Sequence, residues 1–307
     1  MAKLSIIIPC YNESATLARV VEALKEVPLP GWEQEIIVVD DGSIDDTVSR
    51  IKKFPVLLLT QTHLGAGLAR NLGAKRAAGE ILVFVDADMT FSPEFVSNLI
   101  KPILEQKTIG TFSKEEFVSN PKNIWSKCWN YNLGRGANFM DPRDYSGSKN
   151  ALYLFGKNIW EQLEKSQVKT ISSENRQHVF RAILKEEFLK VGGFDENVGY
   201  TDDWSIAEKL KTKAAVASGA VFYHRNPDNL KEVWTQARWF GKNEFLTRNL
   251  VRRLYSLVRY NPVYSLIKGI VGSLKIKEPG FLVFKLIYDS AVFFSVLLSF
   301  FNEPKHK

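Results

Sequence analysis

Two carboxylates at the end of a hydrophobic segment are the side chains of this sequence that most directly indicate chemistry. Residues 81–85 are all apolar, as in a buried strand, and the next three residues are Asp86-Ala87-Asp88. Carboxylates spaced i, i+2, where a strand breaks into a turn, can hold a hard divalent cation beside a phosphate-bearing ligand. The spacing therefore predicts metal-assisted chemistry on a nucleotide.

Short apolar runs alternate with helical patterns around this pair. The runs predict strands at residues 4–9, 35–39, 56–60 and 81–85, and helices are expected at residues 14–25, 45–53 and 67–78. Such alternation is typical of an α/β fold with a mainly parallel sheet and helices on both faces. These sheets bind ligands beyond the carboxyl ends of their strands. We therefore expect the polar segments after three of the strands to meet at one edge: residues 11–13, 40–43 and 86–88.

The regular alternation lapses in the middle of the chain. Residues 113–176 are polar and aromatic, and we expect them to form loops and helices inserted over the ligand site. A further strand is predicted at residues 214–223, ending at His224. The predicted order is a catalytic domain at residues 1–245 followed by a membrane-associating region at residues 246–307.

Positive charge is concentrated near the C-terminal end. The chain of 307 residues has 41 Lys and Arg against 34 Asp and Glu, a formal net charge of +7. Residues 248–277 alone hold seven Lys or Arg and no Asp or Glu, so the rest of the chain is formally neutral. Because apolar residues are interleaved with these cations, the segment fits an anionic membrane surface, with a solvated helix face as the alternative. No nucleic-acid partner is expected.

An apolar stretch follows this basic segment. Residues 281–301 are almost wholly apolar, about the ~20 residues that cross the hydrocarbon core of a bilayer. Lys285 and Asp289 interrupt the stretch at spacing i, i+4, so we expect them to pair, with Lys285 close enough to the start to reach the headgroups. Three structures fit: a membrane-embedded helix, a helix at the membrane interface or an oligomer contact, and a core helix.

The cysteines and the N-terminus favour a cytoplasmic setting. Cys10 and Cys128 are the two cysteines, and this pair predicts neither a disulfide framework nor a zinc site. The first predicted strand begins almost at once, which leaves no room for a signal peptide. We therefore expect the catalytic part to face the cytoplasm at the cell membrane.

Other nucleotide-binding signatures do not fit. Residues 65–70 resemble a dinucleotide fingerprint, but Arg70 stands in place of the third glycine, and the first turn at residues 10–14 has no glycine. A P-loop signature is missing, and no Ser-His-Asp spacing stands out. The carboxylates remain the best candidates for chemistry.

A set of motifs, in this order, resembles the family 2 glycosyltransferases, which have the GT-A (Rossmann-like) fold. The resemblance spans about residues 4–240, and the combination of motifs is more specific than any one of them. The motifs are Ile8-Pro9-Cys10-Tyr11-Asn12-Glu13, Val39-Asp40-Asp41-Gly42-Ser43, Ala69-Arg70-Asn71, Asp86-Ala87-Asp88, Gly192-Gly193-Phe194-Asp195-Glu196, Asp202-Asp203-Trp204 and Gln236-Ala237-Arg238-Trp239.

The resemblance implies a nucleotide-sugar site. Asp40 is expected to hold the base or ribose, since a carboxylate suits ring N–H and hydroxyl donors; its alternative role is the N-cap of the next helix. Tyr11 is available to stack on the base, and Asp86 is assigned to the ribose side. The other residues expected at this site are Pro9, Glu13, Arg70 and Arg238.

The resemblance also implies a metal and a general base. Asp88 is expected to bind Mn²⁺ or Mg²⁺, with His224 as a further ligand of the metal or phosphate. Asp203 is expected to take a proton from the acceptor hydroxyl in a single displacement that inverts the anomeric carbon. The alternative for Asp203 is charge placement at a helix N-terminus. Asp202 departs from the pattern, which usually has Glu at this position.

The segment Gln236-Ala237-Arg238-Trp239 is similar to the Gln-x-x-Arg-Trp motif of membrane-bound synthases of cellulose, chitin and hyaluronan. It implies that Arg238 contacts the diphosphate and that Trp239 offers a flat face to a sugar ring. The residues expected at the acceptor are Asp202, Trp204, Gln236 and Trp239. Because this chain has at most one or two membrane segments, we expect the same site geometry without processive secretion.

Together these features predict an inverting, metal-dependent hexosyltransferase. Its donor is a UDP- or GDP-linked sugar, and its acceptor is a glycan or, from the basic tail, more specifically a lipid-linked molecule at the cytoplasmic membrane face. The alternatives are a nucleotide-sugar-binding membrane scaffold without turnover and a nucleotidyltransferase, which releases pyrophosphate.

Overall fold

The computed structural model describes residues 2–133, apart from Pro28, Pro30 and Lys114, and residues 179–195, 202–244 and 250–301. The described residues form two compact units. The first holds the residues up to Phe117 together with residues 179–224, and the second holds residues 118–133 and the described residues from Arg225 onward. This division places residues 225–244 with the helices that follow them. The catalytic-domain boundary at residue 245 remains a prediction.

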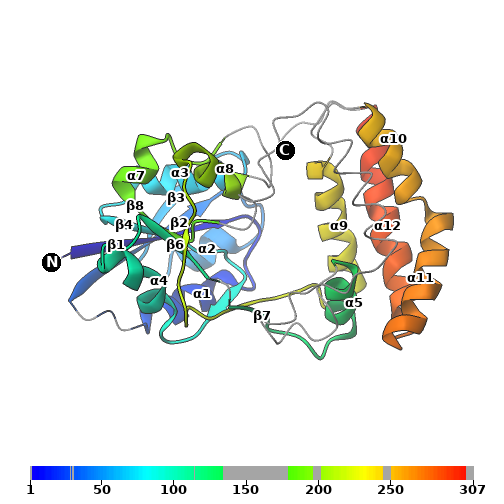
Figure 1. Cartoon of the computed structure of the whole chain (residues 1–307), viewed down its shortest axis with the longest axis horizontal. Coiled ribbons are helices and arrows are strands. Elements are labelled where there is room, and N and C mark those ends of the chain that lie inside the picture. Colours follow the sequence, from blue (N-terminus) through cyan, green and yellow to red (C-terminus); the bar gives the residue numbers. More distant parts are fainter. Residues whose placement is uncertain are drawn as a thin grey trace. The chain divides into compact units, whose positions relative to one another are not determined.

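A seven-stranded sheet lies at the centre of the first unit (Figure 1), with the strand order β3-β2-β1-β4-β8-β6-β9. Strands β1 to β4 are parallel to one another, whereas β8 runs antiparallel to both of its neighbours, β4 and β6. The strands are β1 (Ala2–Cys10), β2 (Trp32–Asp40), β3 (Leu57–Thr60), β4 (Ile81–Phe84), β6 (Gly110–Phe112), β8 (Ala182–Leu184) and β9 (Ala215–Val216).

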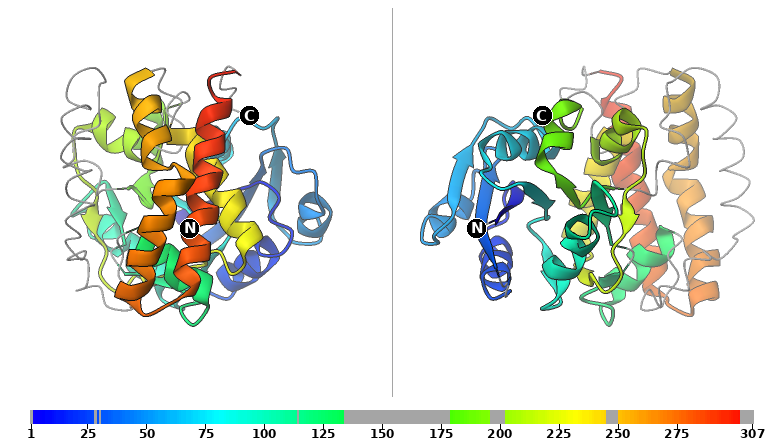
Figure 2. Two further views of the ribbon diagram at one scale, coloured as in Figure 1. Left: turned by 90° about the vertical axis from the view of Figure 1, so that its right-hand side faces the viewer. Right: turned by 60° about the vertical axis from the view of Figure 1, so that its left-hand side comes forward.

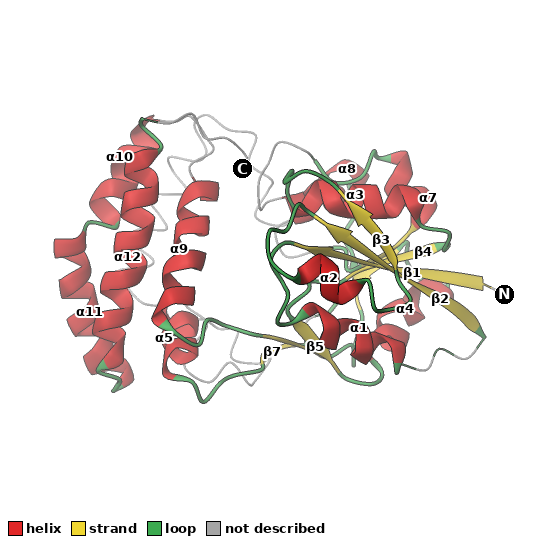
Figure 3. Cartoon of the chain, turned by 180° about the vertical axis from the view of Figure 1, so that it is seen from behind, coloured by secondary structure: helices red, strands yellow, loops and turns green. Residues whose placement is uncertain are grey.

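Helices cover both faces of this sheet, as the alternation of apolar runs and helical patterns predicts (Figure 3). Alternate residues of one strand point to opposite faces, so Ile6 and Ile8 of β1 belong to one core and Ile7 to the other. The core of Ile6 includes residues of α1 (Leu17–Lys25), α2 (Thr47–Ile51) and α4 (Phe95–Leu104). The core of Ile7 includes residues of α3 (Ala66–Arg76), α7 (Lys185–Lys190) and α8 (Asp202–Leu210). Burial on both faces explains why these strands are continuously apolar.

A second, three-stranded sheet has the order β5-β10-β7, formed by β5 (Met89–Phe91), β10 (Phe222–His224) and β7 (Glu116–Val118). The single strand predicted at residues 214–223 is wrong, because β9 joins the large sheet and β10 the small one. Gly219 breaks the run: its φ is +77°, and the side-chain amide of Asn98 donates to its carbonyl at 2.9 Å. In the small sheet His224 pairs with Met89, the residue after Asp88.

The second unit contains five described helices: α5 (Ile124–Asn132), α9 (Leu230–Glu244), α10 (Leu250–Arg259), α11 (Pro262–Ile276) and α12 (Gly280–Leu298). Helix α12 lies between α9 on one side and α10 and α11 on the other (Figure 1). The helix predicted from the apolar stretch at 281–301 is therefore present. Among the described residues it is the helix long and apolar enough to cross a membrane, although much of its surface is buried against the other helices.

A charged cluster lies between α11 and α12. The buried Asp289 carboxylate pairs with Lys285 at 2.8 Å and with Lys268 at 2.6 Å, and it accepts a hydrogen bond from the Ser265 hydroxyl at 2.5 Å. The predicted pairing of Lys285 with Asp289 is thus confirmed. The expectation that Lys285 reaches the headgroups is wrong, because its ammonium group also donates inward to Asn132 Oδ1 at 2.6 Å.

Asn71 of α3 connects this helix to the turn after α7. Its Nδ2 donates to the carbonyl of Phe194 at 2.9 Å, and its Oδ1 accepts from the amide of Phe194 at 2.8 Å. Gly193 has a φ of +73°, and a Cβ at this position would collide with Asn71 Oδ1. Glycine at 193 and asparagine at 71 are therefore required by the same close contact.

Asn71→Ala should lower the free energy of unfolding by about 2–4 kcal/mol, because it leaves a buried amide and carbonyl of Phe194 without partners. Urea unfolding measures the loss. Asn98→Ala, which removes one partly buried hydrogen bond, should lower it by about 1 kcal/mol. Equal losses in the two variants would contradict this role of Asn71.

Candidate active site

The carboxyl ends of β1, β2 and β4 lie at one edge of the large sheet, because these neighbouring strands are parallel. Cys10 pairs with Asp40, and Ile7 pairs with Phe84. The segments after β1 and β2 are also bonded to each other: the Asn12 amide donates to Ser43 Oγ at 2.9 Å, and the Ile44 amide donates to Asn12 Oδ1 at 2.9 Å. The polar segments at residues 11–13, 40–43 and 86–88 thus follow strands that end side by side.

The adjacent Asp40 and Asp41 have different surroundings. Asp40 is 3% exposed and accepts hydrogen bonds from the amides of Gly42 and Ser43, both at 3.2 Å, so it holds the turn at the end of β2. It is not the N-cap of α2: that position is Asp46, and the amide of Thr47, the first residue of the helix, donates to Asp45 at 3.0 Å. The Asp40 carboxylate retains further lone pairs for a donor on a ligand.

Asp41 holds the loop after β3. Its carboxylate accepts from the Leu64 amide at 2.8 Å and from Gln61 Nε2 at 2.7 Å, and it lies 2.8 Å from His63 Nδ1. The His63 ring in turn stacks on Tyr11, with the ring centroids 4.0 Å apart and the planes inclined by 23°. The Tyr11 side chain predicted to stack on a base is therefore positioned by Asp41 through His63, and it is 39% exposed.

Two arginines hold Asp86. Arg70 Nη2 donates to Oδ1 at 2.8 Å, and Arg181 Nη1 donates to Oδ2 at 3.0 Å. Burial opposes ionisation of this carboxyl, but the charges and hydrogen bonds of Arg181 and Arg70 outweigh it and hold the Asp86 pKa well below its usual range. Asp86 is therefore a fixed anion.

Asp88 faces His224 at the same edge. The Oδ2 atom of Asp88 and Nδ1 of His224 are 3.8 Å apart, and both side chains are about one-third exposed. Burial raises the pKa of the Asp88 carboxyl; the nearby His224 opposes this effect, and the charge of Asp86 adds to it. The sequence separates these residues by 136 positions, and the pairing of β5 with β10 brings them together.

This pair fits a divalent cation that keeps most of its ligands from solvent or substrate. No group of three or more His, Cys, Asp or Glu converges within the described ranges. Mg²⁺ and Mn²⁺ are often held by one or two protein groups, with water and phosphate oxygens completing the shell, and imidazole is an acceptable ligand for Mn²⁺. Asp88 and His224 supply such a set, whereas both oxygens of Asp86 are already bonded to arginines.

Three other predicted nucleotide residues have structural contacts. Pro9 is buried in β1 opposite Val39. Glu13 accepts a hydrogen bond from the Thr16 hydroxyl at 2.5 Å, at the start of α1. Arg70 is bonded to Asp86, and its guanidinium also lies over the Phe194 ring. The structure thus gives Arg70 a role in positioning Asp86.

The remaining predicted residues lie on two helices. Asp202, Asp203 and Trp204 begin α8, and their side chains lie outside the described part of the structure. Gln236, Arg238 and Trp239 lie on α9 in the second unit, where Arg238 and Trp239 are exposed. The assignment of Asp203 as general base, of Arg238 to the diphosphate and of the other residues to the acceptor remains a prediction.

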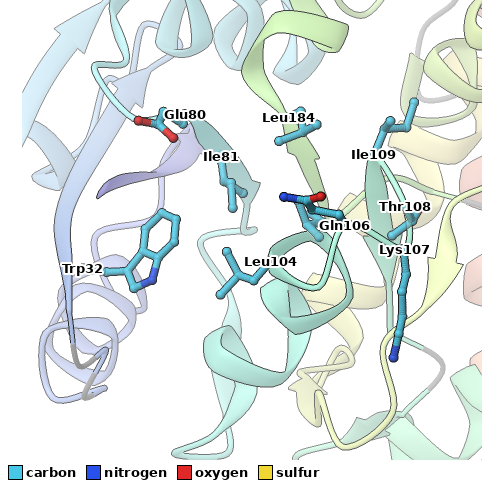
Figure 4. A pocket seen from close by; sticks show the side chains of 10 residues that line it. Trp32, Glu80, Ile81, Leu104, Gln106, Lys107, Thr108, Ile109 and Leu184 are labelled. Carbon is cyan, nitrogen blue, oxygen red and sulfur yellow. The ribbon is translucent and has the colours of Figure 1, made fainter. Parts of the chain in front are cut away.

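A hollow of about 550 Å³ lies at the opposite edge of the large sheet (Figure 4). It is lined by Trp32 at the start of β2, Ile81 at the start of β4 and Leu184 at the end of the antiparallel β8. It is therefore separate from the edge that carries Asp86 and Asp88.

The model of glycosyl transferase family 2 matches residues 5–184, which include the strand ends described above. The chain belongs to this family. The expectation of a family 2 glycosyltransferase is thereby confirmed. The segment Gln236-Ala237-Arg238-Trp239 lies beyond the matched residues, and it has one residue, not the two of the Gln-x-x-Arg-Trp motif, between Gln and Arg.

Relatives of this family 2 chain cover it to different extents. An uncharacterized glycosyltransferase of Haemophilus influenzae is 27% identical over 67% of this chain and 61% of its own length. The dolichol-phosphate mannosyltransferase of Pyrococcus furiosus is 35% identical over 36% of this chain and 33% of its own. The chain thus spans less than two thirds of these relatives.

The fold is shared with a solved structure. Residues 1–349 of Staphylococcus aureus TarS give a TM-score of 0.52 at 16% identity, over 94% of this chain and 90% of that one. Together with the mainly parallel, helix-covered sheet, this likeness confirms the predicted GT-A fold.

Sequence reasoning assigned no role to several residues of the site of this glycosyltransferase. Arg181 precedes a short antiparallel strand, so its approach to Asp86 depends on sheet order, which sequence patterns do not reveal. His63 follows β3, so its position after a strand of the parallel sheet could have indicated that it lies at the ligand-binding edge. Asp41 belongs to the motif at residues 39–43, but only its neighbour Asp40 was predicted to have a role, in binding the nucleoside.

Asp86→Asn should lower the free energy of unfolding at pH 7 by about 1–3 kcal/mol, because it removes a carboxylate bonded to two guanidinium groups. The folded-state pKa is lowered, so the contribution is complete above the unfolded pKa of about 3.9 and is lost as pH falls below it. Urea titrations at pH 7 and pH 3 should therefore show a smaller difference between wild type and variant at pH 3. A difference that is unchanged or larger at pH 3 would refute this.

Proposed function

We propose that this protein is an inverting, metal-dependent glycosyltransferase that moves a sugar from a nucleoside diphosphate sugar to a hydroxyl of the acceptor. The observation that supports this most directly is the arrangement of Asp86, fixed by Arg70 and Arg181, beside Asp88 and His224 at the carboxyl ends of the parallel strands. Such an edge is where open α/β sheets bind nucleotides.

The nucleoside would lie along β1 and β2. Tyr11 offers the face that His63 does not cover for stacking on the base, and Asp40 accepts from a ring N–H or a ribose hydroxyl. Asp86 accepts from the ribose on the other side. TarS has been crystallised with UDP and with UDP-GlcNAc, so uridine diphosphate is the first nucleotide to test here.

Asp88 and His224 would hold Mn²⁺ or Mg²⁺. When bound, the cation supplies charge that neutralises the departing nucleoside diphosphate. Asp88 offers a carboxylate oxygen that the described contacts leave for this purpose, and His224 approaches from the second sheet. In this proposal Arg238 contributes a further positive group to the diphosphate, and Trp239 packs on a sugar ring.

Asp203 is the proposed general base. The acceptor oxygen attacks the anomeric carbon and bonds to it from the face opposite the leaving group, while its proton passes to the Asp203 carboxylate. The anomeric C–O bond breaks, and its electron pair leaves with the nucleoside diphosphate. A single displacement of this kind inverts the anomeric configuration. Asp202, Trp204 and Gln236 would contact the acceptor.

The acceptor is proposed to be lipid-linked and to be reached at the cytoplasmic face of the membrane. The partial match to a dolichol-phosphate mannosyltransferase supports a polyprenyl-type acceptor. The basic segment at residues 248–277 supports a membrane location.

Asp203→Asn should lower the rate of sugar transfer by at least about 100-fold, since a positioned base typically contributes 10²–10⁴-fold. Nucleotide binding should be unchanged. The assay measures release of nucleoside diphosphate from a panel of UDP- and GDP-sugars with Mn²⁺, with a polyprenyl phosphate in detergent as the acceptor.

Glu208→Gln is the matched control, because it removes a carboxylate from an exposed position of the same helix, α8, and should retain wild-type turnover. Near wild-type turnover of Asp203→Asn would reject the base assignment. Release of pyrophosphate from UTP or GTP mixed with a sugar 1-phosphate, with no nucleoside diphosphate released from the sugar panel, would identify a nucleotidyltransferase and reject the proposed reaction.

A further inference from the structure

Helix α11 packs against α12 with its small residues. Ser265, Gly269 and Gly272 are buried at this contact. A Cβ on Gly269 would lie 2.8 Å from Leu282 Cδ1, and a Cβ on Gly272 would collide with the Phe281 ring. The glycines therefore permit close approach of the two helices, as small residues do between helices in membranes.

The opposite side of α11 exposes large aliphatic side chains. Ile267 is 57% exposed and Leu274 is 76% exposed. Helix α10 adds a further apolar face on the same side of α12 (Figure 2). The other exposed apolar residues on these two helices are Leu250, Val251, Leu254, Val258, Val263, Tyr264, Leu266, Ile270 and Val271.

On α11 this arrangement reverses the usual pattern of a helix in a water-soluble protein. Its small and polar residues face α12, where Ser265 and Lys268 bond to the buried Asp289, whereas its large apolar residues face outward. Soluble monomers rarely expose contiguous apolar surfaces of this extent, so such a surface marks an interaction site. An exposed apolar helix face bordered by cations is suited to a lipid surface.

The charges around this face select its partner. Residues 250–277 contain no Asp or Glu, and Lys275 and Lys277 are exposed at the C-terminal end of α11. Two cations of the basic segment are directed inward: Lys268 bonds to Asp289, and Arg253 donates to the carbonyl of Ser299 at 3.1 Å. Because Lys268 and Arg253 are directed inward, the exposed face of α10 and α11 is mainly apolar, and Lys275 and Lys277 lie at its border.

We propose that the outer faces of α10 and α11 lie in the plane of an anionic lipid bilayer and that α12 supports them from within. Helix α11 has 15 residues and is about 22 Å long, shorter than the ~30 Å hydrocarbon core, so it lies in the interface. The contacts of α12 with α9 and α11 make it the inner helix of this layer. This inference deepens the proposed function and rests on it only for the acceptor at the lipid surface.

A lipid surface fits these helices better than a second copy of the chain. A second copy presents the same cations and, on these two helices, no acidic side chain to pair with them. Anionic headgroups are complementary to the exposed cations at the border of this face, and an amphipathic helix beside them gains both apolar burial and electrostatic attraction.

Flotation of the full chain with vesicles tests the proposal. Binding to vesicles of phosphatidylcholine with phosphatidylglycerol should exceed binding to pure phosphatidylcholine and should fall as salt is raised. Ile267→Gln/Leu274→Gln should reduce the bound fraction at least tenfold. The matched control, Leu189→Gln/Val216→Gln, removes two exposed aliphatic groups from the first unit and should bind as wild type.

A fluorescent label on α11 tests whether this helix contacts lipid. Cys10 and Cys128 are buried, so a cysteine introduced at Leu274 takes an environment-sensitive label selectively. Its emission should shift to the blue when vesicles are added, and a label at Leu189 should not shift. The control variant and both labelled proteins must keep the wild-type thermal transition.

Three outcomes would overturn the inference. The first is equal vesicle binding by wild type and all variants, and the second is no vesicle binding by wild type. The third is a wild-type dimer that does not bind vesicles and that becomes a monomer in Ile267→Gln/Leu274→Gln. The last outcome would identify a second copy as the partner. Release of nucleoside diphosphate from the donor is measured separately, without vesicles. If the protein binds vesicles but releases no nucleoside diphosphate, the proposed function alone is rejected. If it releases nucleoside diphosphate but does not bind vesicles, this inference alone is rejected.

Discussion

The carboxylate of Asp86, held between Arg70 and Arg181, is the interaction on which the geometry of the site depends. Arg70 comes from α3, Asp86 follows β4, and Arg181 precedes the antiparallel β8, so one anion connects three elements. Two guanidinium groups keep the carboxyl ionised despite its burial. The fixed turn then positions Asp88, two residues later, opposite His224.

The other family motifs are joined in a similar way across strand ends. Asn12 and Ser43 connect the ends of β1 and β2, Asp41 holds the loop after β3, and Asn71 fixes the turn at Phe194. Each of these residues therefore has a hydrogen-bond partner in another motif or loop.

The sheet was predictable because its strands are buried on both faces and their apolar runs are continuous. The meeting of three polar segments at one edge follows from parallel pairing alone. Partners distant in sequence were not predictable: Arg181 reaches Asp86 only because β8 is inserted beside β4. The predicted strand at 214–223 failed because the turn at Gly219 redirects the chain between two sheets.

The same limitation applies to the basic C-terminal helices. A sequence pattern shows where the cations lie but not which groups they contact. Lys268 faces inward because it pairs with Asp289 on another helix. The apolar outer face of α11 becomes apparent only when Gly269 and Gly272 are seen against α12. The second unit thus combines an apolar core, which contains one charged cluster, with an exposed apolar face on α10 and α11. The first unit carries the sheet edge that is proposed to bind the nucleotide.

The most direct test of this edge is calorimetric titration of uridine diphosphate into wild type and Asp88→Asn, each with and without Mn²⁺. The account predicts that Mn²⁺ tightens binding to wild type at least tenfold and has little effect on Asp88→Asn. Equal tightening in both proteins, or no effect of Mn²⁺ on wild type, would contradict it.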